Sequence, residues 1–222
     1  MSGKSLIGAV VVGLFSAGTV WAVALTPGNT VSLPGNQYPV RTAVEDVDRQ
    51  VDLYTSSNVY VQTVTIRDRV TQMADGSYGF EPFLLNGSAT SGNVNLVRYS
   101  LSDAGFAGFS TDVDYDNTSI TGSVTPNEYP VQATRSADGN TVRFNDPFQL
   151  SDSLAAGQQT DFMDIETNAR DYDLVGTITV TGDATGVGLV SGSVKVFAPI
   201  VPEPGSAGLL ALIAPIAMRR RR

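Results

Sequence analysis

Three aspartates at alternate positions, in the segment DVDYDN, are the residues of this sequence best placed for chemistry. In a loop, the carboxylates of Asp112, Asp114 and Asp116 could converge on a calcium ion, because Ca²⁺ prefers oxygen ligands. The pattern departs from a calcium loop afterwards, since Asn117 stands at the turn glycine and Ser123 at the bidentate glutamate. In a strand, the same spacing places all three side chains on one solvent-facing side. We expect the strand and no cofactor, with calcium as the alternative.

A second group of acidic residues surrounds the segment IETNARDYD. Two carboxylates can hydrolyse a glycosidic bond, but among so many acids some pair lies at a suitable separation by chance. Glycosidases also tend to line their clefts with tryptophan, and the single tryptophan, Trp21, lies in the N-terminal apolar segment. We therefore predict no catalytic residue here, but an acidic loop and strand edge that discourages aggregation. The group comprises Asp161, Asp164, Glu166, Asp171 and Asp173.

Cysteine and histidine are both absent from the 222 residues. Without cysteine the chain has no disulfide, no zinc–thiolate site and no thiol nucleophile. Without histidine it lacks the usual general base near neutral pH and the commonest metal ligand. These absences, with the lack of a nucleophile elbow, a P-loop or a dinucleotide fingerprint, indicate that the protein is not an enzyme.

The charges are divided unevenly along the chain. The net charge is −8, but residues 25–200 carry nine basic and 21 acidic residues, which gives this segment a net charge of −12. An acidic surface repels other polyanions. We therefore expect no nucleic-acid partner and no attraction of this segment to anionic lipid.

Residues 25–200 consist of short alternating runs separated by turn residues, a pattern that predicts antiparallel sheet. In NVYVQTVTIRDRV, for example, Tyr60, Val64, Ile66 and Val70 share one face, and threonines and arginines share the other. LVGTITVTG and GVGLVSGSVKVF should form a final hairpin, whereas AVEDVDRQV has valines at helical spacing as well as strand alternation. About nine or ten strands with this spacing predict an all-β fold, an antiparallel β-sandwich of jelly-roll or immunoglobulin-like type.

Residues 1–24 have the organisation of an export signal. Lys4 supplies a positive charge, residues 6–20 form an apolar helix, and Ala22-Val23-Ala24 is the small-x-small pattern that signal peptidase cleaves. We expect cleavage after Ala24, with a cut after Ala22 or an uncleaved anchor as the alternatives.

Residues 201–222 contain three parts in a fixed order. VPEP is extended and stiff, because each proline fixes φ and disfavours helix before it. Residues 205–218 are uncharged and, as a transmembrane helix about 21 Å long, fall short of the ~30 Å hydrocarbon core. The basic cluster that follows is a cytoplasmic stop under the positive-inside rule. It consists of Arg219, Arg220, Arg221 and Arg222.

This tail resembles the PEP-CTERM sorting signal. The resemblance covers residues 201–222 and implies processing by an exosortase, a membrane enzyme of bacteria that make exopolysaccharide. Pro202, Glu203 and Pro204 would be the recognition element, and the tail would be removed; a tail anchor that stays is the alternative. The segments GFSTDV and IETNARDY make residues 25–200 similar to uncharacterised exported domains that precede such tails, which implies a fold and a location but no activity.

Three regions are thus expected: a signal peptide (1–24), a β-sandwich domain (25–200) and a sorting signal (201–222). The predicted protein is exported, held in the membrane by its C-terminal helix, and then placed at the cell surface or in the extracellular matrix. The alternative function is a carbohydrate-binding or Ca²⁺-dependent adhesive module on the same scaffold, with exopolysaccharide as its partner.

Overall fold

The computed structural model describes residues 22–35, 41–116, 129–145 and 153–201. In this part of the chain the secondary structure is thirteen strands and one 3₁₀ turn, η1 (Ala89–Ser91), and no helix found there is long and apolar enough to cross a membrane. The strands are β1 (Val23–Ala24), β2 (Thr30–Ser32), β3 (Thr42–Thr55), β4 (Tyr60–Gln72), β5 (Tyr78–Phe80), β6 (Phe83–Asn86), β7 (Leu96–Ala104), β8 (Thr111–Asp116), β9 (Gln132–Arg135), β10 (Thr141–Phe144), β11 (Phe162–Thr167), β12 (Tyr172–Ala184) and β13 (Gly188–Pro199).

The structure does not test the helices predicted at the two ends of the sequence, in residues 1–24 and 205–218. Residues 1–21 and 202–222 lie outside the described residues, so only Ala22 to Ala24 and Val201 of the two terminal predictions are described.

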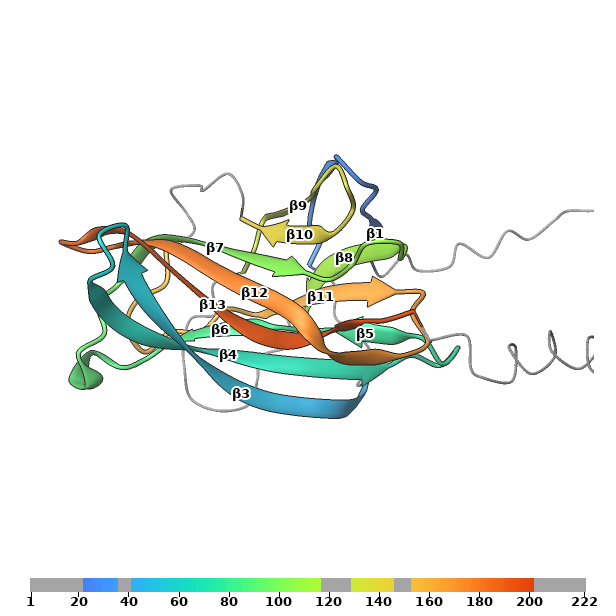
Figure 1. Cartoon of the computed structure of the whole chain (residues 1–222), viewed down its shortest axis with the longest axis horizontal. Helices are drawn as coiled ribbons and strands as arrows, with labels where there is room; N and C mark the ends of the chain where they lie inside the picture. The colour runs from blue at the N-terminus through green and yellow to red at the C-terminus, as the bar shows by residue number, and fades with distance from the viewer. Residues whose placement is uncertain (1–21, 36–40, 117–128, 146–152, 202–222) are drawn as a thin grey trace, which may run out of the picture.

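The strands form one antiparallel sheet that curls into a nearly closed barrel (Figure 1). Their order is β1-β8-β11-β5-β4-β3-β13-β12-β7-β10-β9-β2, with β6 beside β4. The prediction of an all-β antiparallel fold is confirmed, but the two separate sheets of a sandwich are not, because β3 and β13 join the halves. Val190 pairs with Thr55 and Ser191 with Tyr54, and the next residue, Gly192, passes so close to the Asp52 carbonyl that a side chain would overlap it.

The core lies inside this barrel and is built by strict alternation. In β4 the side chains of Val64, Ile66 and Val70 are fully buried, as predicted. Tyr60, at the start of the strand, is exposed, although the pattern placed it on the same face. Buried aliphatic and aromatic side chains from both halves of the sheet meet in one cluster, which provides most of the stability available to an antiparallel sheet of this kind.

The two longest hairpins are β3–β4 and β12–β13. β12 and β13 pair from Tyr172↔Pro199 to Ala184↔Gly188, as the sequence predicted. The segment AVEDVDRQV lies within β3, which pairs with β4 along its length, so the helical spacing of its valines is not used.

The segment from β1 to β2, residues 23–32, closes the barrel, and we call it the N-terminal clasp. Its first strand pairs with β8 at one edge of the sheet, and its second pairs with β9 at the other edge. A turn with a hydrogen bond from the Asn29 amide to the Thr26 carbonyl separates the two strands. Ten residues therefore bridge the edges that the sheet would otherwise leave open.

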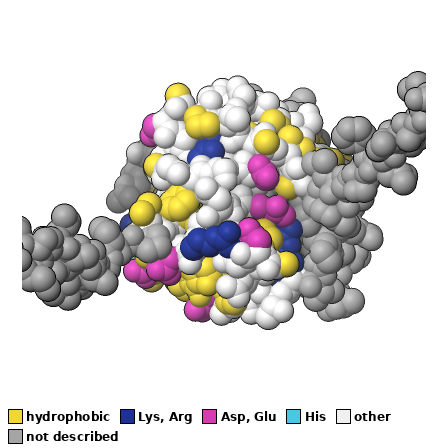
Figure 2. All heavy atoms as spheres, turned by 90° about the vertical axis from the view of Figure 1, so that its right-hand side faces the viewer, with side chains coloured by type: hydrophobic (Ala, Val, Ile, Leu, Met, Phe, Trp, Pro, Cys, Tyr) yellow, Lys and Arg dark blue, Asp and Glu magenta, His cyan; other side chains and the backbone are white. Residues whose placement is uncertain are grey.

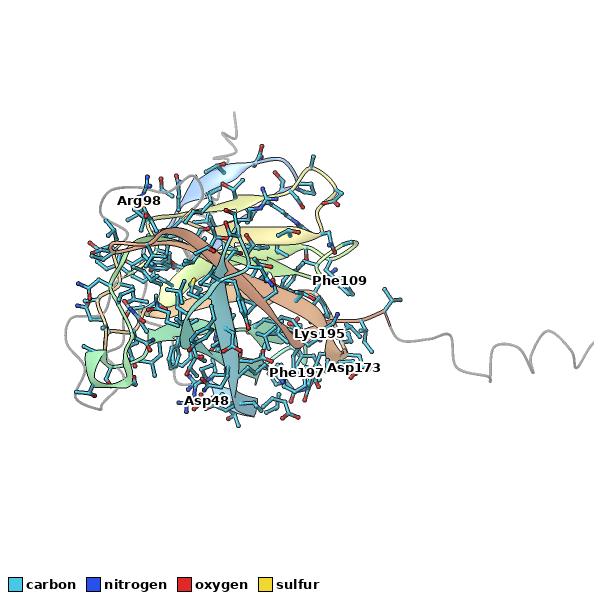
Figure 3. The ribbon with its side chains drawn as sticks, turned by 60° about the vertical axis from the view of Figure 1, so that its left-hand side comes forward. Asp48, Arg98, Phe109, Asp173, Lys195 and Phe197 are labelled. Atoms are coloured by element: carbon cyan, nitrogen blue, oxygen red, sulfur yellow. The ribbon has the colours of Figure 1, made fainter. Side chains whose placement is uncertain are left out.

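The barrel has two distinct ends. Arg98, near the start of β7, and Phe109, beyond its end, lie at opposite ends of the molecule (Figure 3). The described chain both begins and ends at the end that carries Phe109, the right-hand side of Figure 1. We call this the termini end, and the other the hairpin end.

Candidate functional site

The predicted signal cleavage site is part of the folded sheet. Ala22 is 9% exposed, Ala24 lies in β1, and Leu25 is 1% exposed. The Leu25 amide donates to the Thr111 carbonyl at 2.9 Å. The sheet therefore includes residues that a cut after Ala24 would remove.

The predicted sorting residues, Pro202 to Pro204, and the arginine cluster, Arg219 to Arg222, lie outside the described residues. The chain immediately before them is described: the Ile200 amide donates to the Asp171 carbonyl at 3.2 Å, and Val201 is 71% exposed. The last backbone bond of the sheet is thus two residues before the proline–glutamate–proline motif.

The three alternating aspartates lie on one strand, β8. Asp112 is half-buried and stands opposite Ala24 on one side and Glu166 on the other. Asp114 is fully buried, which corrects the prediction that it faces solvent: the segment at Gly35 covers it, and its carboxylate accepts from the Gly35 and Tyr115 amides, both at 2.8 Å. The side chain of Asp116 lies outside what the structure describes.

A calcium site at these residues stays a prediction. Among the described residues, no three acidic side chains are grouped closely enough to hold a metal ion. Asp112 and Asp114 lie on one face of β8, but the Asp114 carboxylate is occupied by two backbone amides, and strand spacing keeps the two side chains apart where a loop could bring them to one point.

A groove crosses the termini end beside Asp112; it is mainly polar on one side of this residue and mainly apolar on the other. Two adjoining pockets of about 360 and 300 Å³ share Ser110 and Asp112. Figure 2 faces this end and shows acidic and basic side chains gathered on it. The first pocket is lined by Met73, Asp75, Ser77, Ser110, Asp112, Glu166, Thr167 and Asn168, and the second reaches the clasp at Ala24 to Pro27.

Behind the groove, one arginine holds three carboxylates. Arg41 Nη1 contacts both oxygens of Asp164 at 3.0 and 3.1 Å and Glu81 Oε1 at 3.3 Å, and Nη2 contacts Glu166. Burial raises the pKa of Asp164 well above its usual range, although the charge of Arg41 opposes this shift. The cluster joins the start of β3, the β5–β6 connection and β11.

The acidic group predicted around IETNARDYD is divided by the fold. Asp171 and Asp173 are exposed, although Asp173 lies in β12, which stands between β13 and β7 in the sheet. Asp161 and Asp164 are buried, so for them the prediction is wrong. The reason is that β11 is not an edge strand, because β8 and β5 pair with it on both sides.

Two carboxylates that the sequence analysis did not single out point into the barrel. Asp68 accepts from Arg49 Nε at 2.7 Å and from the Phe197 amide at 3.0 Å. Asp103 is 1% exposed, and its Oδ1 has no hydrogen-bond partner among the described residues. Burial, together with the nearby charge of Asp68, raises the pKa of Asp103 well above its usual range. The burial of Asp68 could have been predicted from the sequence, because Asp68 alternates in register with Val64, Ile66 and Val70.

A buried arginine, Arg135, fastens the N-terminal clasp. Its guanidinium donates to four carbonyl oxygens: Gly139 at 3.0 Å, Leu25 at 3.1 Å, Phe106 at 3.0 Å and Phe109 at 2.7 Å. These carbonyls belong to the clasp, the β7–β8 connection and the β9–β10 turn. Nothing in the spacing of the sequence indicated this role, because the partners are backbone atoms.

Comparisons of the chain with models of known protein families, with characterised proteins and with solved structures find no match.

Proposed function

We propose that this protein is an exported, non-enzymatic surface or extracellular-matrix protein whose C-terminal segment is a sorting signal of the PEP-CTERM type, processed by an exosortase. The observation that carries the proposal is the order of parts after the sheet: an extended proline–glutamate–proline motif, an uncharged run over 205–218 and four arginines. Pro202 begins directly after an exposed residue, Val201, so a processing enzyme could reach the motif without unfolding β13.

The arrangement of the two ends supports the same proposal. The described chain begins and ends at the termini end, so an anchor on either side would hold that end at the membrane and leave the hairpin end outward. Residues 25–200 contain 21 acidic and nine basic residues, and this negative net charge does not favour binding to anionic lipid.

For the fold, we propose that the two halves of the sheet act as the layers of a sandwich. One half contains β1, β8, β11, β5, β4 and β3, with β6 beside β4. The other half contains β13, β12, β7, β10, β9 and β2. They are joined by two residue pairs between β3 and β13 and by the clasp, and side chains from both fill the core between them.

The test of sorting uses the full chain in a bacterium that carries an exosortase. Replacing Pro202, Glu203 and Pro204 with alanine should leave the protein uncut in the membrane fraction, because the stop is intact and the recognition element is gone. Replacing the four arginines with serine should instead weaken retention, because no positive charge then opposes translocation.

The parent protein, under the same conditions, should reach the surface or the medium with a shortened C-terminus. If the alanine variant is released and trimmed as efficiently as the parent, the motif is a connecting segment and the sorting proposal fails.

The alternative, a carbohydrate-binding module, is favoured by the groove at the termini end. Its lining of carboxylate, hydroxyl and amide groups is of the kind that positions a hydroxyl-rich ligand. Retention of the parent protein, but not of a variant with Asp75 and Asn168 changed to alanine, on immobilised exopolysaccharide would support this function; equal retention of both would remove it.

A further inference from the structure

The residue at which the predicted mature chain would begin is already held by the sheet. The Leu25 amide donates to Thr111, and the Leu25 carbonyl accepts from Thr111 Oγ1 at 3.0 Å and from Arg135 Nη1 at 3.1 Å. These three bonds do not involve residues 22–24. They would therefore keep the backbone of Leu25 beside β8 after β1 had been removed.

Asp112 is the carboxylate beside this position. Ala24 stands directly opposite it in the β1–β8 pair, and cross-strand neighbours of this kind have their Cβ atoms about 5 Å apart. Asp112 lines the same pocket as Ala24 and Leu25, and no hydrogen bond or ion pair to another described residue engages its carboxylate. Its side chain is thus free to turn toward the space that Ala24 occupies.

Cleavage after Ala24 would place a new positive charge at this point. The amide of Leu25, a residue that is 1% exposed while residues 22–24 are in place and that lines the pocket beside Asp112, would become an α-ammonium group. A charge at such a site requires an opposite charge. Arg135, bound to the same residue, adds a like charge and makes that requirement stronger.

Of the other carboxylates, Asp138 also lines this pocket. It already accepts hydrogen bonds from Ser136 Oγ and from the Asn140 amide. The titratable and charged groups around the new terminus are therefore Asp112 from β8, Arg135 from β9 and Asp138 from the β9–β10 turn, and Asp112 is the unengaged acid among them.

We propose that Asp112 is the anchor of the mature N-terminus: after signal-peptide cleavage its carboxylate pairs with the α-ammonium group of Leu25 and takes over the link between clasp and β8 that β1 provides. This inference rests on the proposed export and on the cut after Ala24. Removal of the signal would then leave the barrel closed, with a salt link in place of two residues of strand.

The experiment measures the reactivity of the α-amine in protein that a bacterial host has exported and processed from the full chain. A chain that begins at Leu25 contains one lysine, Lys195, which is exposed and serves as an internal control amine. An amine-acylating reagent is applied from pH 6 to 10, and the modification of each amine is followed by mass spectrometry.

Relative to the parent, Asp112→Asn should acylate at the α-amine about tenfold faster at pH 6, where the amine is mostly protonated in both proteins. Loss of an opposite charge lowers the pKa of an amine by about one unit or more, which leaves more of it unprotonated. Asp112→Glu should remain slow, because it keeps the charge. Asp138→Asn is the matched control from the same pocket and should behave like the parent, and Lys195 should react equally in all four proteins.

The outcomes separate the two proposals. A processed chain that begins at Leu25, but whose α-amine reacts equally in the parent and in Asp112→Asn, overturns the anchor and leaves export standing. A chain that begins at Val23 does the same, because Leu25 then has no free amine. A chain that retains Met1 overturns export and the anchor together.

Discussion

Asp103 shows what the barrel interior does to a single carboxyl group. The side chain is buried, and one of its oxygens has no partner in the part of the chain that the structure describes. Burial raises its pKa in the folded protein well above the usual value of 3.8, and the charge of Asp68 adds to the effect. The folded chain therefore holds this proton more tightly than the unfolded chain does. The stability that results is fully present below the usual carboxyl pKa and is lost as the pH rises through the folded-state value.

Asp103→Asn should consequently stabilise the protein in alkaline solution. Asparagine keeps the shape of the protonated acid but cannot ionise, so we expect the free energy of unfolding at pH 8 to rise by about 1–3 kcal/mol, and the gain to shrink toward pH 4. Urea unfolding at the two pH values measures both quantities. Asp173→Asn, at an exposed position, should change stability by less than about 0.5 kcal/mol at either pH. A variant at Asp103 that is no more stable than the parent at pH 8 would contradict this account.

At the scale of the elements, the clasp depends on one side chain. Arg135 binds carbonyls of three separate segments, and methionine in its place would leave the Gly139 and Phe109 carbonyls without this donor, whereas the Leu25 and Phe106 carbonyls would lose one of two donors. Because an unsatisfied buried polar group costs about 1–3 kcal/mol, Arg135→Met should lower the free energy of unfolding by about 3 kcal/mol or more.

The matched control for that variant is Arg98→Met. Arg98 is partly exposed and pairs with Asp183 at 2.7 Å, and exposed ion pairs contribute about 1 kcal/mol or less. Denaturant unfolding of the two variants compares them directly. If Arg135→Met costs no more than Arg98→Met, the clasp is not held by the guanidinium.

The strands themselves could be predicted from the sequence wherever alternation was regular. The buried face of β4 and the β12–β13 hairpin follow from period-two patterns. In β3 the valines fitted a helix as well as a strand, and pairing with β4 along the whole strand decided between them, which is a tertiary effect that local spacing does not contain.

The candidate site was less accessible to sequence reasoning. Alternation placed Asp112 and Asp114 on one face, which is correct, but the sequence does not show that the segment at Gly35 covers Asp114. Asp68 and Asp103, for which no prediction was made, face the interior, where distant strands supply their surroundings. Closure of the barrel by residues 23–32 depends on which strands lie at the edges of the sheet. The order of strands is set by the whole fold, so local sequence patterns could not predict this closure.

At the scale of the whole molecule, the two ends of the barrel differ in the side chains that they expose. Polar groups and both chain ends lie at the termini end. At the hairpin end, the β3–β4 and β12–β13 tips carry exposed apolar side chains, Val59, Tyr60, Val187 and Leu189. Under the proposed function the termini end faces the membrane until both terminal segments are removed, and the hairpin end faces outward.

The intact mass of the protein, purified from a bacterium that carries an exosortase, tests export and sorting together, because one spectrum reports both ends of the chain. We expect a chain that begins at Leu25 and ends near Pro202 to Pro204, without residues 205–222. Since the C-terminal cut lies beyond β13 and the N-terminal cut removes only β1, the trimmed protein should also retain a β-type circular dichroism spectrum. The mass of the uncut chain, from Met1 to Arg222, in the surface or secreted fraction would contradict this expectation.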